Sequence, residues 1–131
     1  MQFKPPKDDS KYQWTNHVTA KMLYYGISES LIKRIVRFPK RIETGIAPGT
    51  IAVMSPYGIS PKKEQPYKGE VWVMYIDIGK KPISNSRLSI SNFQSAKKKI
   101  ISAWRYPGVS PKGKTIPIPD EIAAELQDML E

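Results

Sequence analysis

The change of hydrophobic pattern at Pro39 constrains the fold of this chain more than any other feature of its sequence. Before Pro39, apolar residues recur every three or four positions, as they do along one face of a helix. After it, short apolar runs are separated by segments rich in proline and glycine, which is typical of strands and turns. Proline also disfavours the helical conformation of the residue before it, here Phe38. The sequence therefore predicts helices first and strands afterwards.

Two short helices are predicted before this change. Thr15 or Asn16 can cap the first helix, and Gly26 ends it in the left-handed conformation. Ser28 caps the second helix, which extends to about Arg37. Because only one residue separates Gly26 from Ser28, we expect the two helices to form a tight hairpin.

Three or four strands are expected after the hairpin, and one of them is central. The segment EVWVMYIDI at 70–78 is apolar on both of its faces, as a strand that is covered on both sides should be. Loops are expected at 55–69 and at 79–97, the second being a long excursion. The remaining extended segments are predicted at 41–46, 50–54 and 99–106, with a short edge strand around 12–14.

A third helix is predicted at the C-terminal end. Pro119 suits the first position of a helix, and acidic residues follow it at the positive end of the helix dipole. Its apolar face would be formed by Ile122, Leu126, Met129 and Leu130.

The order of these elements predicts an α+β fold, in which an N-terminal helical hairpin packs on a three- to four-stranded antiparallel sheet. The C-terminal helix completes it. We expect residues 1–13 to form a flexible N-terminal arm and 14–131 to form a single domain.

Composition excludes several classes of protein. The chain has 131 residues and no cysteine, so disulfides, thiolate catalysis and cysteine-based zinc sites are excluded. With a single histidine, we expect no metal site and no cofactor. No apolar run has the length of a signal peptide or a membrane span, and we expect a cytoplasmic protein. Phosphate-binding loops, dinucleotide fingerprints and nucleophile elbows do not occur in the sequence.

The distribution of charge points to nucleic acid as a partner. The net charge is +9, but residues 119–131 hold five acids and no base, so the rest of the chain carries +14. A basic body of this kind can bind phosphate groups. An acidic protein partner would also suit it, and a basic chain can simply be soluble without any such partner. Nothing in the composition indicates a membrane partner or an oligomeric state.

Several segments carry a resemblance to a known group of proteins. The first is HVTAKM followed by YGIS, between His17 and Ser28; the others are PKRIETG, VWVMYI and ISAWRYPG. Together they resemble the RelE/ParE/BrnT toxin-like fold, in a branch whose first helix has the pattern His-x-x-x-(Lys/Arg)-Met and leads to Gly-Ile-Ser. The resemblance covers about residues 14–107. It implies a relation in shape to barnase-type and colicin-type ribonucleases, and a toxin-like, metal-independent endoribonuclease activity.

Metal-free RNA cleavage needs a proton acceptor, a proton donor and cations that neutralise the phosphate. His17 is the one side chain with an ordinary pKa near neutrality, so it is our first catalytic candidate. Arg105 is the best phosphate ligand because a guanidinium binds phosphate bidentately, and Tyr106 could position or protonate the substrate. The alternatives are a packing role for His17 and an ion pair of Arg105 with an acid such as Glu43 or Asp77.

Other basic and aromatic residues are candidates for nucleic-acid contacts. Basic side chains would neutralise phosphates, and an exposed tryptophan could stack on an unpaired base. The alternatives are a solvated face for the lysines and a core position for the tryptophan. The candidates are Lys21, Arg41, Lys97, Lys98, Lys99 and Trp104.

Three functions therefore remain open. The first is a small ribonuclease, the second is a non-catalytic nucleic-acid-binding module on the same fold, and the third is an antitoxin-like module that binds an acidic partner. The first two differ in whether His17 and Arg105 converge in one cleft.

Overall fold

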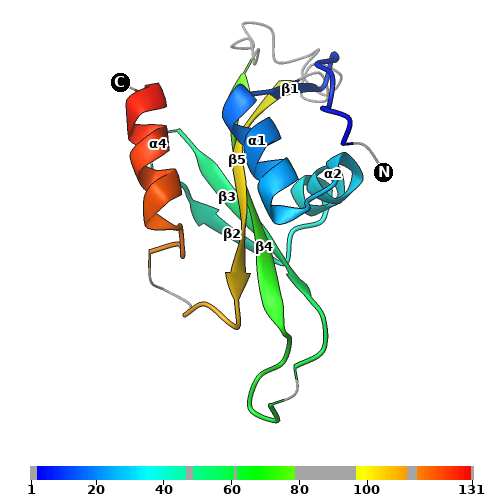
Figure 1. The fold of residues 1–131 in the computed structure, drawn as a ribbon, viewed down its shortest axis with the longest axis vertical. Helices are drawn as coiled ribbons and strands as arrows, with labels where there is room; N and C mark the ends of the chain where they lie inside the picture. The colour runs from blue at the N-terminus through cyan, green and yellow to red at the C-terminus, as the bar shows by residue number, and fades with distance from the viewer. Residues whose placement is uncertain (1–2, 47–48, 61, 79–96, 112–114, 131) are drawn as a thin grey trace, which may run out of the picture.

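The computed structural model describes residues 3–46, 49–60, 62–78, 97–111 and 115–130 (Figure 1). The excursion predicted at 79–97 lies outside the described residues except for Lys97. The three helices in the described part are α1 (Asn16–Tyr25), α2 (Glu29–Arg37) and α4 (Asp120–Leu130). The strands are β1 (Tyr12–Trp14), β2 (Arg41–Thr44), β3 (Ile51–Tyr57), β4 (Gly69–Ile78) and β5 (Lys97–Pro107).

The two predicted N-terminal helices are present, with the caps that their sequence predicts. The Thr15 side chain accepts a hydrogen bond from the backbone N–H of Val18, so that Thr15 rather than Asn16 is the N-cap of α1. Gly26 ends α1 with φ of 68°, in the left-handed region that favours glycine. Ser28 caps α2 by accepting from the backbone N–H of Leu31. Local hydrogen bonds thus determine where both helices begin and end.

The five strands form one mixed sheet in the order β1-β5-β4-β3-β2. The pairs from β2 to β5 are antiparallel, as predicted, but β1 pairs with β5 in parallel. The expectation of a purely antiparallel sheet is therefore wrong. The short edge strand predicted at 12–14 is present, and the last residues of the predicted arm (1–13) belong to it: Tyr12 and Trp14 alternate with Gln13 and are both buried, so burial holds this segment against β5.

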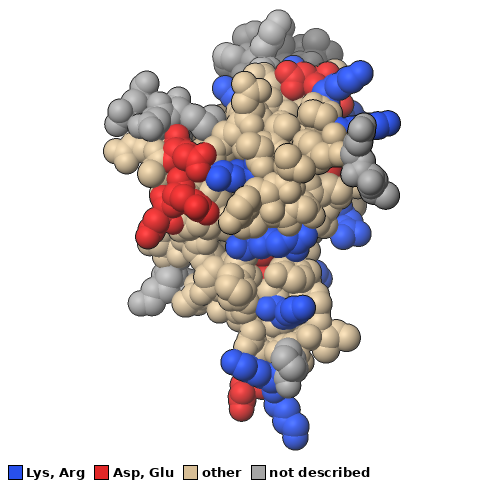
Figure 2. Space-filling model, viewed as in Figure 1, with Lys and Arg blue, Asp and Glu red and all other residues tan. Residues whose placement is uncertain are grey.

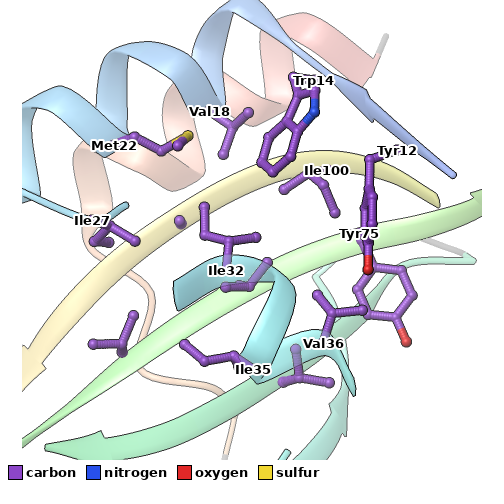
Figure 3. Packing of buried hydrophobic residues seen from close by; sticks show 14 residues of the cluster. Tyr12, Trp14, Val18, Met22, Ile27, Ile32, Ile35, Val36, Tyr75 and Ile100 are labelled. Carbon is purple, nitrogen blue, oxygen red and sulfur yellow. The ribbon is translucent and has the colours of Figure 1, made fainter. Parts of the chain in front are cut away.

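The sheet has two faces with different coverings. The helices α1 and α2 pack on the face that we call the hairpin face, where Val18, Met22 and Ile32 meet the strands (Figures 1 and 3). The opposite face, here called the α4 face, is covered by Ile122 and Leu126, both of which are fully buried. This confirms two of the four predicted contacts of the last helix; the side chains of the other two residues, Met129 and Leu130, lie outside the described part.

The strand β4 is buried on both faces, which confirms its predicted central position. Trp72 on β4 lies opposite Trp104 on β5, and their rings are stacked on the α4 face with centroids 6.2 Å apart. A β-bulge between Met74 and Tyr75 shifts the register of the two strands. The pairing passes from Ser102 to Ile100 and skips Ile101, which packs in the α4-face cluster while Ile100 packs in the hairpin-face cluster.

Candidate nucleic-acid interface

Arg105 lies near the end of β5 and is held rigidly on the hairpin face. Its Nε donates to the backbone oxygen of Tyr25 (2.8 Å) and its Nη2 donates to that of Gly26 (3.2 Å). These carbonyls are at the C-terminal end of α1, where a helix leaves oxygens without partners and carries partial negative charge. The guanidinium also lies over the ring of Tyr57, 4.9 Å from its centroid. The end of α1 and the Tyr57 ring therefore fix the position of this cation.

Arg105 has no carboxylate partner among the residues that the structure describes. The two acids that were candidates for its ion pair are engaged elsewhere. Glu43 binds Arg41 at 2.6 Å, and Asp77 binds Lys98 at 2.7 Å. Because main-chain carbonyls carry no net charge, Arg105 keeps its full positive charge at the surface.

His17 lies at the other end of α1 and is engaged on both ring nitrogens. Its Nε2 is 2.8 Å from the Oγ of Ser102, and its Nδ1 is 3.3 Å from an oxygen of Glu125. Its side chain is 5% exposed. Burial lowers the pKa of His17, while the nearby Glu125 carboxylate raises it by less. A lowered pKa favours the neutral ring, and the carboxylate beside Nδ1 favours the tautomer in which Nδ1–H donates to Glu125 and Nε2 accepts from the serine hydroxyl.

The three predicted catalytic residues do not converge. Tyr25 follows His17 by eight positions, or about 12 Å along a helix, and Arg105 is bound at the Tyr25 end. Tyr106 packs on the α4 face, opposite to Arg105, because neighbouring residues of a strand point to opposite faces. The cleft that the ribonuclease interpretation requires is thus not formed by these side chains.

Two of the predicted phosphate ligands are already paired with acids. Lys21 lies 2.9 Å from Glu125, whose hydrogen bond raises the pKa of the lysine. Arg41 binds Glu43, donates to the Oγ of Ser110 at 2.7 Å and lies over the ring of Trp72. In each pair, the negative charge of the acid balances the positive charge of the basic side chain.

Trp104 is fully buried, so its predicted contact with nucleic acid is wrong. Its place in β5 puts it on the α4 face, where it stacks on Trp72 beneath α4. The three neighbouring lysines begin β5 and are half-buried; Lys98 is paired with Asp77 and lies over the ring of Tyr75. Lys97 and Lys99 therefore stay open as candidates for phosphate contacts.

Sequence analysis missed a buried acid on the α4 face. The Glu70 carboxylate accepts hydrogen bonds from the Tyr67 hydroxyl (2.5 Å), Trp72 Nε1 (2.9 Å) and the backbone N–H of Ser110 (3.0 Å). Burial works to raise the pKa of Glu70, but the hydrogen bonds from Ser110, Tyr67 and Trp72 outweigh it and lower this pKa. Burial and the bond to the carboxylate raise the pKa of Tyr67 to about 12. The signal in the sequence was a charged residue at the start of an otherwise apolar strand.

A cavity of about 410 Å³ lies next to this acid. The segment after β5 closes one side of it, and β2 and β3 close the other. It is lined by Lys40, Arg41, Glu43, Met54, Pro56, Tyr67, Val109 and Ser110. Lys40 and Arg41 of this lining are balanced by two acids, Glu43 in the lining and Glu70 behind it. The cavity therefore has no excess of positive charge that would attract a phosphate.

The described residues contain no group of three or more His, Asp and Glu side chains that could hold a metal ion. No described helix is both long and apolar enough to cross a membrane. No protein-family model, curated protein or solved structure matches this chain. The resemblance to the RelE/ParE/BrnT toxin-like fold thus stays a prediction from the sequence.

Proposed function

We propose that this protein binds RNA, without cleaving it, through the surface around Arg105. The observation that carries the proposal is the fixed guanidinium of Arg105, which keeps its charge because it bonds to carbonyls of Tyr25 and Gly26 instead of a carboxylate. A guanidinium binds two phosphate oxygens at once, and its rigid placement lowers the entropy cost of doing so.

The surroundings of Arg105 extend this cationic surface. The lower half of the sheet projects beyond the helical hairpin, and β3, β4 and the end of β5 meet there (Figure 1). The exposed Lys68 follows the β3–β4 loop, and its backbone N–H bonds to the oxygen of Tyr57. In Figure 2, basic side chains spread over this face from the hairpin down to the loop; the largest group of acidic side chains lies over α4, and smaller ones lie at the top of the view and at the tip of the loop. A negatively charged backbone would follow the same path.

We propose no cleavage of the bound RNA. The neutral, hydrogen-bonded His17 lies one helix length away from Arg105, and Tyr106 packs on the other face of the sheet. A toxin-like ribonuclease and a module for an acidic protein partner are the competing functions, and each gives a different result in the following experiment.

The experiment measures the binding of fluorescently labelled single-stranded RNA in EDTA, from about 50 to about 200 mM salt. We expect binding that weakens steeply with salt, with intact RNA afterwards on a denaturing gel. Cleaved RNA would replace the proposal with the ribonuclease function. Absence of binding at the lowest salt would contradict both RNA functions and leave the acidic protein partner.

A further inference from the structure

One side of α1 carries a second set of donors that suits a phosphate group. Lys21 and His17 lie one helical turn apart, and both point at the Glu125 carboxylate of α4. The lysine Nζ is 2.9 Å from one carboxylate oxygen, and the imidazole Nδ1 is 3.3 Å from the other. Two cationic or N–H donors that each bind one oxygen of the same anion form the arrangement that a phosphate also requires.

The imidazole is held in the orientation that this role needs. Ser102 is fully buried, and its hydroxyl is bonded to Nε2 of His17 at 2.8 Å. With Nε2 used as an acceptor, the ring proton is on Nδ1 and is directed at the anion. A neutral histidine can therefore serve as a donor here.

The Glu125 carboxylate can move away from Lys21 and His17 without unfolding α4, the helix that carries it. The side chain of Glu125 is 47% exposed, whereas Ile122 and Leu126 anchor α4 and are fully buried. Water and salt can compete for the Glu125 carboxylate from its exposed side, although the side chains of Lys21 and His17 are only 14% and 5% exposed. A change of the Glu125 rotamer alone would open both donors to solvent.

We propose that Lys21 and His17 form a phosphate-binding site, and that the Glu125 carboxylate occupies this site in the free protein. The phosphate is one of the RNA backbone, so this inference rests on the proposed function for its physiological ligand. The carboxylate acts as an internal competitor, and RNA that reaches α1 from the Arg105 surface must displace it.

The first test removes the competitor. Glu125→Gln keeps the size of the side chain and loses its charge, and its matched control is Glu29→Gln. Glu29 binds Lys33 at 2.7 Å with similar exposure, so the control also frees one lysine of a helix and changes the net charge equally. We expect Glu125→Gln to raise the affinity for single-stranded RNA by about threefold to tenfold, against about twofold or less for the control.

The salt dependence separates a new phosphate contact from a general gain in charge. One further contact with a single strand should steepen the slope of log K against log salt by about 0.7. Adding Lys21→Ala to Glu125→Gln should abolish both the gain and the steeper slope. Equal effects of Glu125→Gln and Glu29→Gln would overturn the proposal.

A second test uses inorganic phosphate, so that the site can be judged apart from RNA. In Glu125→Gln, the imidazole ¹⁵N resonances of His17 should shift with phosphate and saturate, while chloride at equal ionic strength should leave them unchanged. Shifts without any RNA binding would keep the anion site and refute the proposed function. Unchanged resonances would refute the site, even if RNA binds elsewhere; near-ultraviolet circular dichroism confirms that the variant is folded.

Discussion

Two regions of the molecule hold their cations in different ways. Next to α4 and along β2, Lys21 and Arg41 each meet a carboxylate, at 2.9 and 2.6 Å. On the hairpin face, Arg105 meets only backbone carbonyls and an aromatic ring among the residues described. All three are basic residues of one chain with a net charge of +9, and the sequence favoured Arg105 as the phosphate ligand with Lys21 and Arg41 as further candidates.

This difference shows that the ability of a basic side chain to bind phosphate depends on the acids near it as much as on its own charge. The acids of this protein concentrate in the C-terminal helix, which packs on the α4 face (Figure 2). Glu125 of this helix pairs with Lys21, whereas Arg41 pairs with Glu43 of β2 and Lys98 pairs with Asp77 of β4. Arg105 is left without a carboxylate among the described residues because no acid of either group lies within its reach.

The largest expected effect concerns the neighbours Trp104 and Arg105, which point to opposite faces of β5. Trp104 is fully buried against Trp72, so Trp104→Ala should lower the free energy of unfolding by about 3–5 kcal/mol. Urea denaturation measures this loss. Trp104→Phe should cost less, because it keeps a ring and removes an indole N–H that has no partner in the described structure. A loss below about 1 kcal/mol for Trp104→Ala would contradict the buried position.

The next effect tests whether α4 truly covers its face. Leu126 is fully buried, so Leu126→Ala should lower the free energy of unfolding by about 2–5 kcal/mol. The control is Leu23→Ala on α1, where the side chain is 61% exposed and we expect a change within about 0.5 kcal/mol. Equal losses for the two variants, measured by urea denaturation, would mean that α4 does not form part of the core.

A smaller effect compares a free cation with a paired one. Arg105→Ala should weaken RNA binding by about tenfold, or about 1.4 kcal/mol, because an unneutralised phosphate ligand is lost. Lys98→Ala, in which the lysine is paired with Asp77, should weaken it by about twofold or less. Arg105→Lys should fall between Arg105→Ala and the unaltered protein, since it keeps the charge but loses the bidentate geometry. Fluorescence anisotropy measures all four proteins, and equal losses at 105 and 98 would remove the distinction between a free and a paired cation.

The sequence predicted the helices of this fold better than the roles of its side chains. The limits of α1 and α2 depend on local caps at Thr15, Gly26 and Ser28, which can be read from short segments. The parallel pairing of β1 could not be predicted in this way, because it depends on contacts with residues some 85 positions later in the chain.

The candidate site illustrates the same limit. The strand containing Trp104 was expected, but which face of the sheet α4 covers decides whether that ring is buried or exposed. His17 was singled out for its chemistry, yet its partners, Ser102 and Glu125, come from distant parts of the chain. The uncompensated charge of Arg105 likewise depends on where Glu43 and Asp77 find their own partners.

The smallest effect concerns the dependence of stability on pH at the α4 end of α1. Burial holds the pKa of His17 below its ordinary value of 6.5, so the unfolded chain binds more protons than the folded one just below that pH. The free energy of unfolding should therefore fall as the pH is lowered from about 6.5 towards 5. The carboxylates with lowered pKa, those of Asp9, Glu70 and Glu125, add a further loss only as the pH falls below about 4.5.

His17→Gln isolates this contribution, because glutamine does not titrate and can still form hydrogen bonds. Between pH 7 and about 5, its stability in urea should stay flat while that of the unaltered protein declines. A parallel decline in both would assign the loss to other groups. A rise of stability on acidification would mean that the Glu125 carboxylate raises the pKa of His17 by more than burial lowers it. His17 would then carry a positive charge beside Glu125 instead of being neutral.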